Sequence, residues 1–109
     1  MAKTITLTFD GKEYTLEFTR STIAEMERRG FRAGDIEDKP MLTLPALFSG
    51  AFLAHHRGIK ANVVDAIFNK IPDKQQFIQA LGEMYNEPLE ALIDDPADDE
   101  GNAQWSQNW

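Results

Sequence analysis

The chain has 109 residues, of which 42% are apolar and 27% charged, and its formal net charge is −7. This length and composition are typical of one soluble globular domain. The acidic balance argues against a nucleic-acid-binding protein that neutralises phosphates and against a polybasic membrane anchor. Because the chain contains no cysteine, disulfides, thiolate nucleophiles and Cys-ligated metal centres are excluded. No apolar run approaches the roughly 20 residues of a membrane span and no signal-peptide core is present, which favours a cytoplasmic protein.

The negative charge is concentrated at the C-terminal end of the chain. Residues 94–109 contain five acids and no base, so residues 1–93 carry 13 acids and 11 bases. The C-terminal segment has no aliphatic residue larger than alanine and cannot bury enough surface to order itself. We therefore predict a single folded domain over residues 1–93 and a disordered acidic tail over residues 94–109.

Residues 4–18 have the pattern of a β-hairpin. Apolar residues occupy every second position over residues 5–9 and again over residues 14–18, which is typical of strands with one buried face. Asp10-Gly11 lies between them and tolerates the positive φ angles of a type I′ turn. A two-residue turn there places both apolar sets on the same face. Because an isolated hairpin is only marginally stable, helices must cover that face.

Four helical segments follow the hairpin. Thr22 and Glu25 predict a capping box at the start of the first helix, and Gly30 predicts its end. We expect residues 32–43 to form a loop. The second helix should begin near Leu44-Pro45 and continue to Gly58.

The last two helices are expected to begin at Asn62 and at Asp73, which are favourable capping residues. Pro88 should kink or split the fourth helix, with Asn86 capping a final short segment. The sequence therefore predicts an α+β domain, with an N-terminal β-hairpin followed by about four helices.

The sequence contains no recognisable catalytic or metal site. His55 and His56 are adjacent, so on a regular helix they point roughly 100° apart and cannot bind one ion together. We interpret both as structural, with His55 continuing an apolar helix face and His56 more exposed. The paired carboxylates Asp94-Asp95 and Asp98-Asp99 lie in the predicted tail, which offers no fixed geometry. We therefore expect no enzyme, metal or cofactor; a metal-dependent enzyme that uses either histidine is a competing hypothesis.

Two groups of side chains are candidates for binding other proteins. Apolar side chains at helical spacing are core residues by default, but those that line a groove would suit an amphipathic partner helix. Two tryptophans near the end of the tail either fold back on the body or contact a partner. These partner-binding candidates are Phe48, Phe52, Phe68, Phe77, Met84, Tyr85, Trp105 and Trp109.

The second group is basic and surrounds the first predicted helix. It is either a solvated face or a docking site for an acidic segment, such as this chain's own tail. Its members are Arg20, Arg28, Arg29 and Arg32.

The order of these elements, together with one sequence stretch, resembles a known family. The stretch reads Leu-Pro-Ala-Leu-Phe-Ser-Gly-Ala-Phe-Leu-Ala-His-His-Arg-Gly-Ile over residues 44–59. It lies between the hairpin and a predicted helix that contains Glu83-Met84-Tyr85. In this order and in its acidic tail, the chain resembles the tail assembly chaperones of long-tailed bacteriophages, in the small form from phages of Gram-positive hosts. The resemblance spans most of residues 1–93 and includes no catalytic motif.

The resemblance implies a non-enzymatic protein that binds the tape measure protein, a long and largely helical chain. It would keep that chain soluble until the tail tube polymerises around it, in the host cell cytoplasm, and would be absent from the mature virion. Further partners would be a longer form of the protein made by ribosomal frameshifting, the tail tube protein and other copies of itself; we expect no nucleic acid or membrane partner. The alternative function is an acidic phage-encoded inhibitor or adaptor that binds a host or phage protein.

Overall fold

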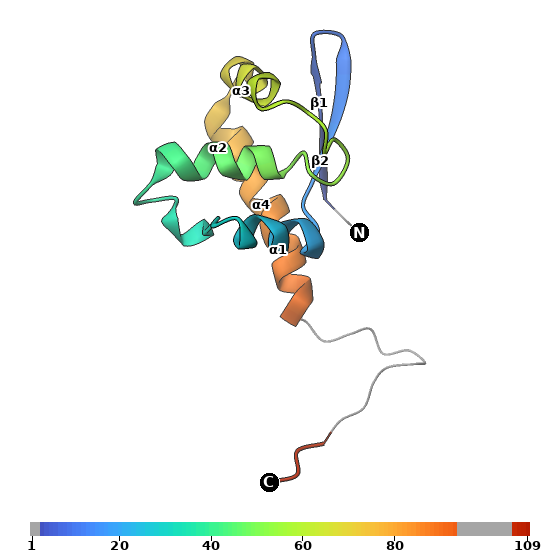
Figure 1. Cartoon of the computed structure of the whole chain (residues 1–109), viewed down its shortest axis with the longest axis vertical. Coiled ribbons are helices and arrows are strands. Elements are labelled where there is room, and N and C mark those ends of the chain that lie inside the picture. Colours follow the sequence, from blue (N-terminus) through green and yellow to red (C-terminus); the bar gives the residue numbers. More distant parts are fainter. Residues whose placement is uncertain (1–2, 94–105) are drawn as a thin grey trace.

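The computed structural model describes residues 3–93 and 106–109, and Figure 1 shows their arrangement. Within these residues the elements are β1 (Thr4–Phe9), β2 (Lys12–Glu17), α1 (Arg20–Arg28), the short 3₁₀ helix η1 (Ala33–Asp35), α2 (Pro40–Gly50), α3 (Ala61–Lys70) and α4 (Lys74–Ile93). The predicted α+β class, a β-hairpin followed by four helices, is confirmed. Of the tail predicted over residues 94–109, residues 94–105 lie outside the described residues, and residues 106–109 are exposed and irregular.

The hairpin has the predicted register. Leu7 lies opposite Tyr14 and Ile5 lies opposite Leu16 in an antiparallel pair. Asp10 and Gly11 have φ angles of 52° and 76°, as a type I′ turn requires at its two central residues. The apolar side chains of β2 are buried, whereas those of β1 on the same face are only half-buried.

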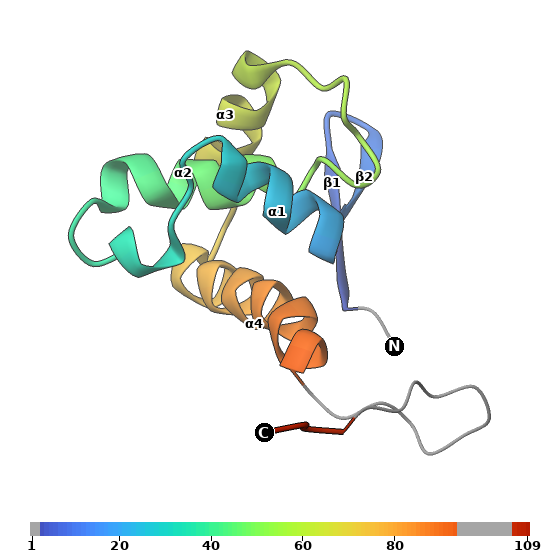
Figure 2. The same cartoon turned by 60° about the horizontal axis from the view of Figure 1, so that its bottom comes forward.

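Helix α2 holds the helical part of the fold together. It contacts α1, α3, α4 and η1, and α1 crosses α4 on one side of it (Figures 1 and 2). The apolar face of the hairpin packs against the helices through aromatic contacts. The ring of Tyr14 lies edge-on to that of Phe52, with 5.9 Å between the ring centroids, and the rings of Phe18 and Tyr85 make the same kind of contact at 5.3 Å. The buried apolar residues are Tyr14, Leu16, Phe18, Ile23, Met26, Leu47, Phe48, Ala51, Phe52, Val64, Ile67, Leu81, Met84 and Tyr85.

Helix α1 begins three residues earlier than the capping box predicted from Thr22 and Glu25. Thr19 is extended, with φ −123° and ψ 164°, and its hydroxyl accepts a hydrogen bond from Thr22 N, while Thr19 N donates to the hydroxyl of Thr22. Thr22 therefore supplies the third helical position of the box and not its cap. That prediction was wrong because the Thr-x-x-Glu spacing selects Thr22, whereas the structure uses Thr19, another favourable cap residue, with a threonine in place of glutamate at the third helical position. At the other end, Phe31 N donates to the carbonyl of Met26 past Gly30, as the predicted end requires.

Helix α2 lies earlier in the chain than predicted. It starts at Pro40, inside the segment predicted as a loop, and ends at Gly50, well before Gly58. Pro40 occupies the first helical turn, where the N–H that proline lacks would have no helical partner. Pro45, predicted to begin the helix, lies inside it, and residues 51–55 continue as turns.

Two predictions about the last two helices also need correction: the cap residue of α3 and the split of α4 at Pro88. Helix α3 is preceded by Lys60 as its cap residue, so Asn62 lies inside the helix. Helix α4 runs unbroken through Pro88 to Ile93, with no separate segment capped by Asn86. Beyond Pro88, Leu89 and Leu92 line a groove with α1, and the helix continues past the one N–H that proline lacks.

We expect Phe48→Ala to lower the free energy of unfolding by about 3–5 kcal/mol, because the Phe48 side chain is fully buried (0% exposed) in contact with the rings of Phe52, Phe68 and Phe77. Urea unfolding followed by circular dichroism measures this value. The matched control on the same helix is Met41→Ala, which removes a side chain that is 87% exposed and should change stability by no more than about 0.5 kcal/mol. Equal effects of the two substitutions would contradict the placement of Phe48 in the core.

Candidate functional site

The structure separates the predicted partner-binding residues into core and surface. Phe48, Phe52, Met84 and Tyr85 are buried, so in this conformation they offer no contact surface to a partner. Burial, with a smaller contribution from Glu27, raises the pKa of the Tyr85 hydroxyl above its ordinary value of 10.0.

The remaining partner-binding candidates lie nearer the surface. Phe68 and Phe77 are half-buried and pack against the core. Trp109 is 96% exposed, and Trp105 lies outside the described residues.

The four predicted docking arginines are exposed but do not form one site. Arg20 and Arg28 are at opposite ends of α1, roughly 12 Å apart along the helix axis at 1.5 Å per residue. Arg29 and Arg32 line a groove of about 410 Å³ between the end of α1, η1 and α2, whereas Arg20 lines a different groove between α1 and α4. An acidic segment bound at one of these grooves would not contact all four guanidinium groups.

Glu25 binds two arginines from different parts of the chain. Its carboxylate accepts a hydrogen bond from Arg29 Nη2 at 2.6 Å and two from Arg57 at 2.9 Å. These hydrogen bonds, first among them the one from Arg57, lower the pKa of Glu25 below its ordinary value and raise that of Arg57. The side chain predicted to cap α1 therefore attaches α1 to the segment between α2 and α3.

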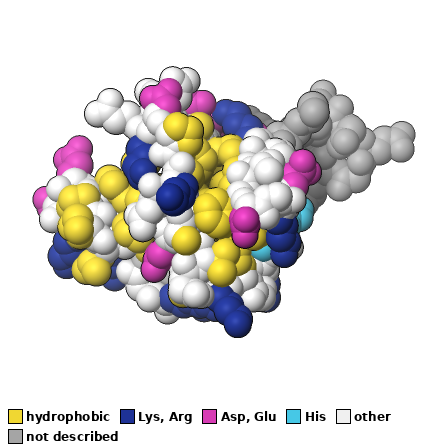
Figure 3. All heavy atoms as spheres, turned by 90° about the horizontal axis from the view of Figure 1, so that it is seen from above, with side chains coloured by type: hydrophobic (Ala, Val, Ile, Leu, Met, Phe, Trp, Pro, Cys, Tyr) yellow, Lys and Arg dark blue, Asp and Glu magenta, His cyan; other side chains and the backbone are white. Residues whose placement is uncertain are grey.

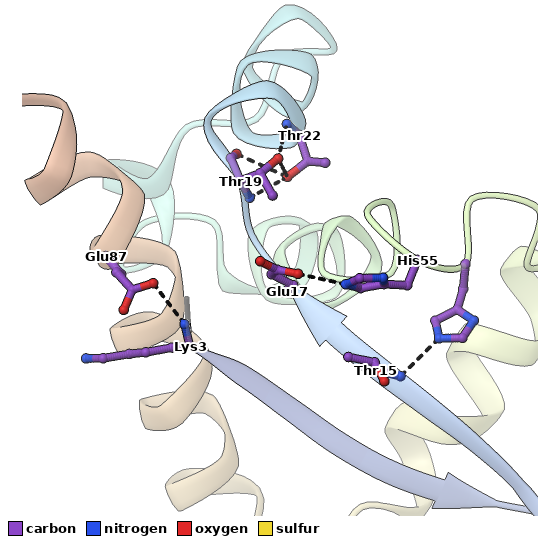
Figure 4. Close-up of polar contacts among 8 residues, drawn as sticks. Lys3, Thr15, Glu17, Thr19, Thr22, His55 and Glu87 are labelled. Atoms are coloured by element: carbon purple, nitrogen blue, oxygen red, sulfur yellow. Dashed lines mark hydrogen bonds and ion pairs between the residues drawn. The ribbon is translucent and has the colours of Figure 1, made fainter. Parts of the chain in front are cut away.

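The two histidines attach that same segment to the hairpin (Figure 4). His55 Nε2 lies 2.7 Å from Glu17 Oε1, and His56 Nε2 accepts a hydrogen bond from Thr15 N at 3.0 Å. The predicted exposures are reversed: His55 is exposed, and His56 is half-buried against the ring of Tyr14. The helical periodicity that placed His55 on the apolar face ends with α2 at Gly50.

No metal-binding arrangement is present among residues 3–93 and 106–109, where no group of three or more His, Asp or Glu side chains is gathered. In the same part of the chain, no helix is both long enough and apolar enough to cross a membrane.

The most exposed apolar residues of the helical body form two patches outside the residues predicted to bind a partner. Met41 and Leu42 are at the start of α2, in the segment predicted as a loop. Leu89, Leu92 and Ile93 are at the end of α4, and Leu92 and Ile93 are 54% and 84% exposed. Leu89 and Leu92 continue the helical spacing of the buried residues Leu81, Met84 and Tyr85 beyond the core.

The second patch borders a groove between two helices. This α1–α4 groove has a volume of about 360 Å³ and is lined by Ile23 and Ala24 of α1 and by Pro88, Leu89 and Leu92 of α4. The charged side chains Arg20 and Glu27 also line it. Seen from the end with α3 and the hairpin turn, other apolar side chains lie among separate acidic and basic ones (Figure 3).

A protein-family comparison matches residues 1–109 to a family described as a domain of unknown function, DUF5055, and the chain belongs to this family. No curated protein and no solved structure matches the chain.

We expect the free energy of unfolding to fall as the pH is lowered from about 7 to about 5, in part through His56. Burial, followed by the charges of His55 and Lys12, lowers the pKa of His56 below its ordinary value of 6.5. The folded protein thus holds His56 neutral, as the bond from Thr15 N requires. The stabilisation is complete above pH 6.5 and is lost as the pH falls through the lower folded pKa.

The measurement is urea unfolding at several pH values, with His56→Gln as the comparison. The Gln amide oxygen reaches as far as Nε2 and accepts a hydrogen bond, but it does not titrate. Because His55 and Glu25 are retained in both proteins, the difference between the two curves isolates His56. Parallel curves between pH 7 and 5 would contradict this role.

Proposed function

We propose that this member of the DUF5055 family is a phage tail assembly chaperone, which binds the tape measure protein and keeps it soluble before the tail tube polymerises. Two considerations support the proposal: the resemblance described for residues 44–59 and the order of elements around them, and the α1–α4 groove with its exposed apolar neighbours. In this role the protein acts in the host cell cytoplasm and is absent from the mature virion. A longer frameshifted form of the protein and the tail tube protein are the further partners that the role implies.

The observation that carries the proposal is the apolar end of α4. Leu89, Leu92 and Ile93 are spaced three and four residues apart, so they lie on one face of the helix. Leu89 and Leu92 line the α1–α4 groove and Ile93 extends the apolar surface beyond it. Clusters of exposed apolar side chains with polar neighbours mark interaction sites, whereas single exposed residues do not.

The partner that we expect at this surface is a helix. An amphipathic helix binds a groove through apolar side chains at positions i, i+3, i+4 and i+7. The α1–α4 groove lies between two helices, and its lining is mostly apolar but includes the charged side chains Arg20 and Glu27. These charges can pair with either sign on the polar flanks of a bound helix. Covering the apolar stripe of a long helical chain in this way would oppose its aggregation.

The test is co-expression of the chain with the tape measure protein encoded near its gene. The full-length chain should raise the soluble yield of the tape measure protein and co-purify with it. Leu92→Asp should reduce co-purification about tenfold or more, because it removes about half of the 1.5–3 kcal/mol of a full leucine burial and places an unpaired charge in the contact. The matched control is Met41→Asp, at an exposed apolar position outside the groove, which should retain binding.

A truncation that ends at Ile93 separates the helical body from the C-terminal residues, and should also retain binding. Circular dichroism establishes that each variant is folded. A tape measure protein that stays insoluble and unbound in the presence of the full-length chain would overturn the proposed function. Undiminished binding by Leu92→Asp would keep the function but exclude the groove.

A further inference from the structure

The outer edge of β2 is already covered by the chain itself. Thr15 N donates to His56 Nε2 at 3.0 Å, and Glu17 N donates to the carbonyl of Ala51 at 3.0 Å. Both acceptors belong to the segment that follows α2, which passes along the hairpin in Figure 1. No additional strand can pair with β2 while this segment is in place.

The outer edge of β1 is different. Thr6 and Thr4 lie opposite Thr15 and Glu17, whose N–H groups point away from β1. In an antiparallel ladder, two opposite residues that do not hydrogen-bond to each other both direct their backbone N–H and C=O groups away from the partner strand. The N–H and C=O groups of Thr4, Thr6 and Thr8 therefore point to the outer edge, and nothing in the described part of the chain hydrogen-bonds to them. All three residues are exposed.

We propose that this edge pairs with β1 of a second copy of the chain, in antiparallel orientation, to form a four-stranded sheet across a two-fold axis at Thr6. The alternation of polar and apolar residues in β1 supports self-pairing. Threonine occupies every even position over residues 4–8, and apolar residues occupy the odd positions. A two-fold axis at Thr6 sets Thr6 opposite itself and Ile5 opposite Leu7. Threonine thus meets threonine on the solvent face, and apolar side chains meet on the core face.

Charge and burial favour the same partner. Lys3 precedes β1 and Asp10 follows it, so antiparallel pairing brings Lys3 of each copy beside the turn that carries Asp10 of the other. The apolar side chains of β1 are only half-buried in one copy, and a second strand would cover them further. A groove of about 270 Å³ beside β1, lined also by Ile71 and Phe77, leaves room for apolar side chains of the added strand. This dimer does not depend on the proposed chaperone function, since it uses neither α1 nor the end of α4.

Two opposite charge substitutions at Thr6 test the pairing on the full chain. The wild-type protein should sediment at high micromolar concentration with twice the 12.3 kDa mass of one chain. Thr6→Lys alone, and Thr6→Glu alone, should each give the monomer mass, because each places two like charges opposite one another on the axis. An equimolar mixture of the two variants should again give the dimer mass, because opposite charges then face each other.

The mixture provides an internal control, since misfolded variants would not recover a dimer when combined. Met41→Lys places the same charge at an exposed position on α2, away from β1, and should leave the dimer unchanged. A wild-type protein that stays monomeric at high micromolar concentration would overturn the proposal. So would a dimer that persists in Thr6→Lys and in Thr6→Glu, or variants whose mixture stays monomeric.

Discussion

The fold depends on the covering of one face of a two-stranded sheet. A hairpin of this size is marginal in water, and helices of nine and ten residues, such as α1 and α3, are also too short to be stable alone. The hairpin and the helices are stable only when packed together. Tyr14 on β2 contacts Phe52, which follows α2, and Phe18, just after β2, contacts Tyr85 of α4. The domain should therefore unfold as one cooperative unit.

The parts of the fold that were predictable from the sequence are those decided by neighbouring residues. Alternation over residues 4–18 and the Asp10-Gly11 turn determine the strand register without reference to the rest of the chain. Helix ends are less local. Thr19 and Thr22 are both favourable cap residues, and Pro40 and Pro45 both fit a first helical turn. The choice within each pair depends on the path of the chain between packed elements, which periodicity does not encode.

The candidate site was only partly predictable, because helical spacing does not distinguish a core stripe from a binding stripe. Phe48 and Leu92 each continue an apolar pattern at helical spacing, yet one is enclosed and the other is half exposed. The difference arises because α4 extends beyond the elements that cover its first turns. Met41 and Leu42 were missed for another reason, since their segment was predicted as a loop. The exposures of His55 and His56 were predicted in the wrong order for a related reason, because α2 ends at Gly50, before it reaches either histidine.

The unequal edges of the hairpin have a consequence for the size of any assembly built through it. Sheets that are open at both edges can add strands without limit, which is the route to fibres. Here His56 and the carbonyl of Ala51 occupy the edge of β2, so a copy that associates through β1 brings another closed edge with it. Growth would end at two chains. The turn after α2 would then act as a terminator of polymerisation, because it leaves the dimer without an open strand edge.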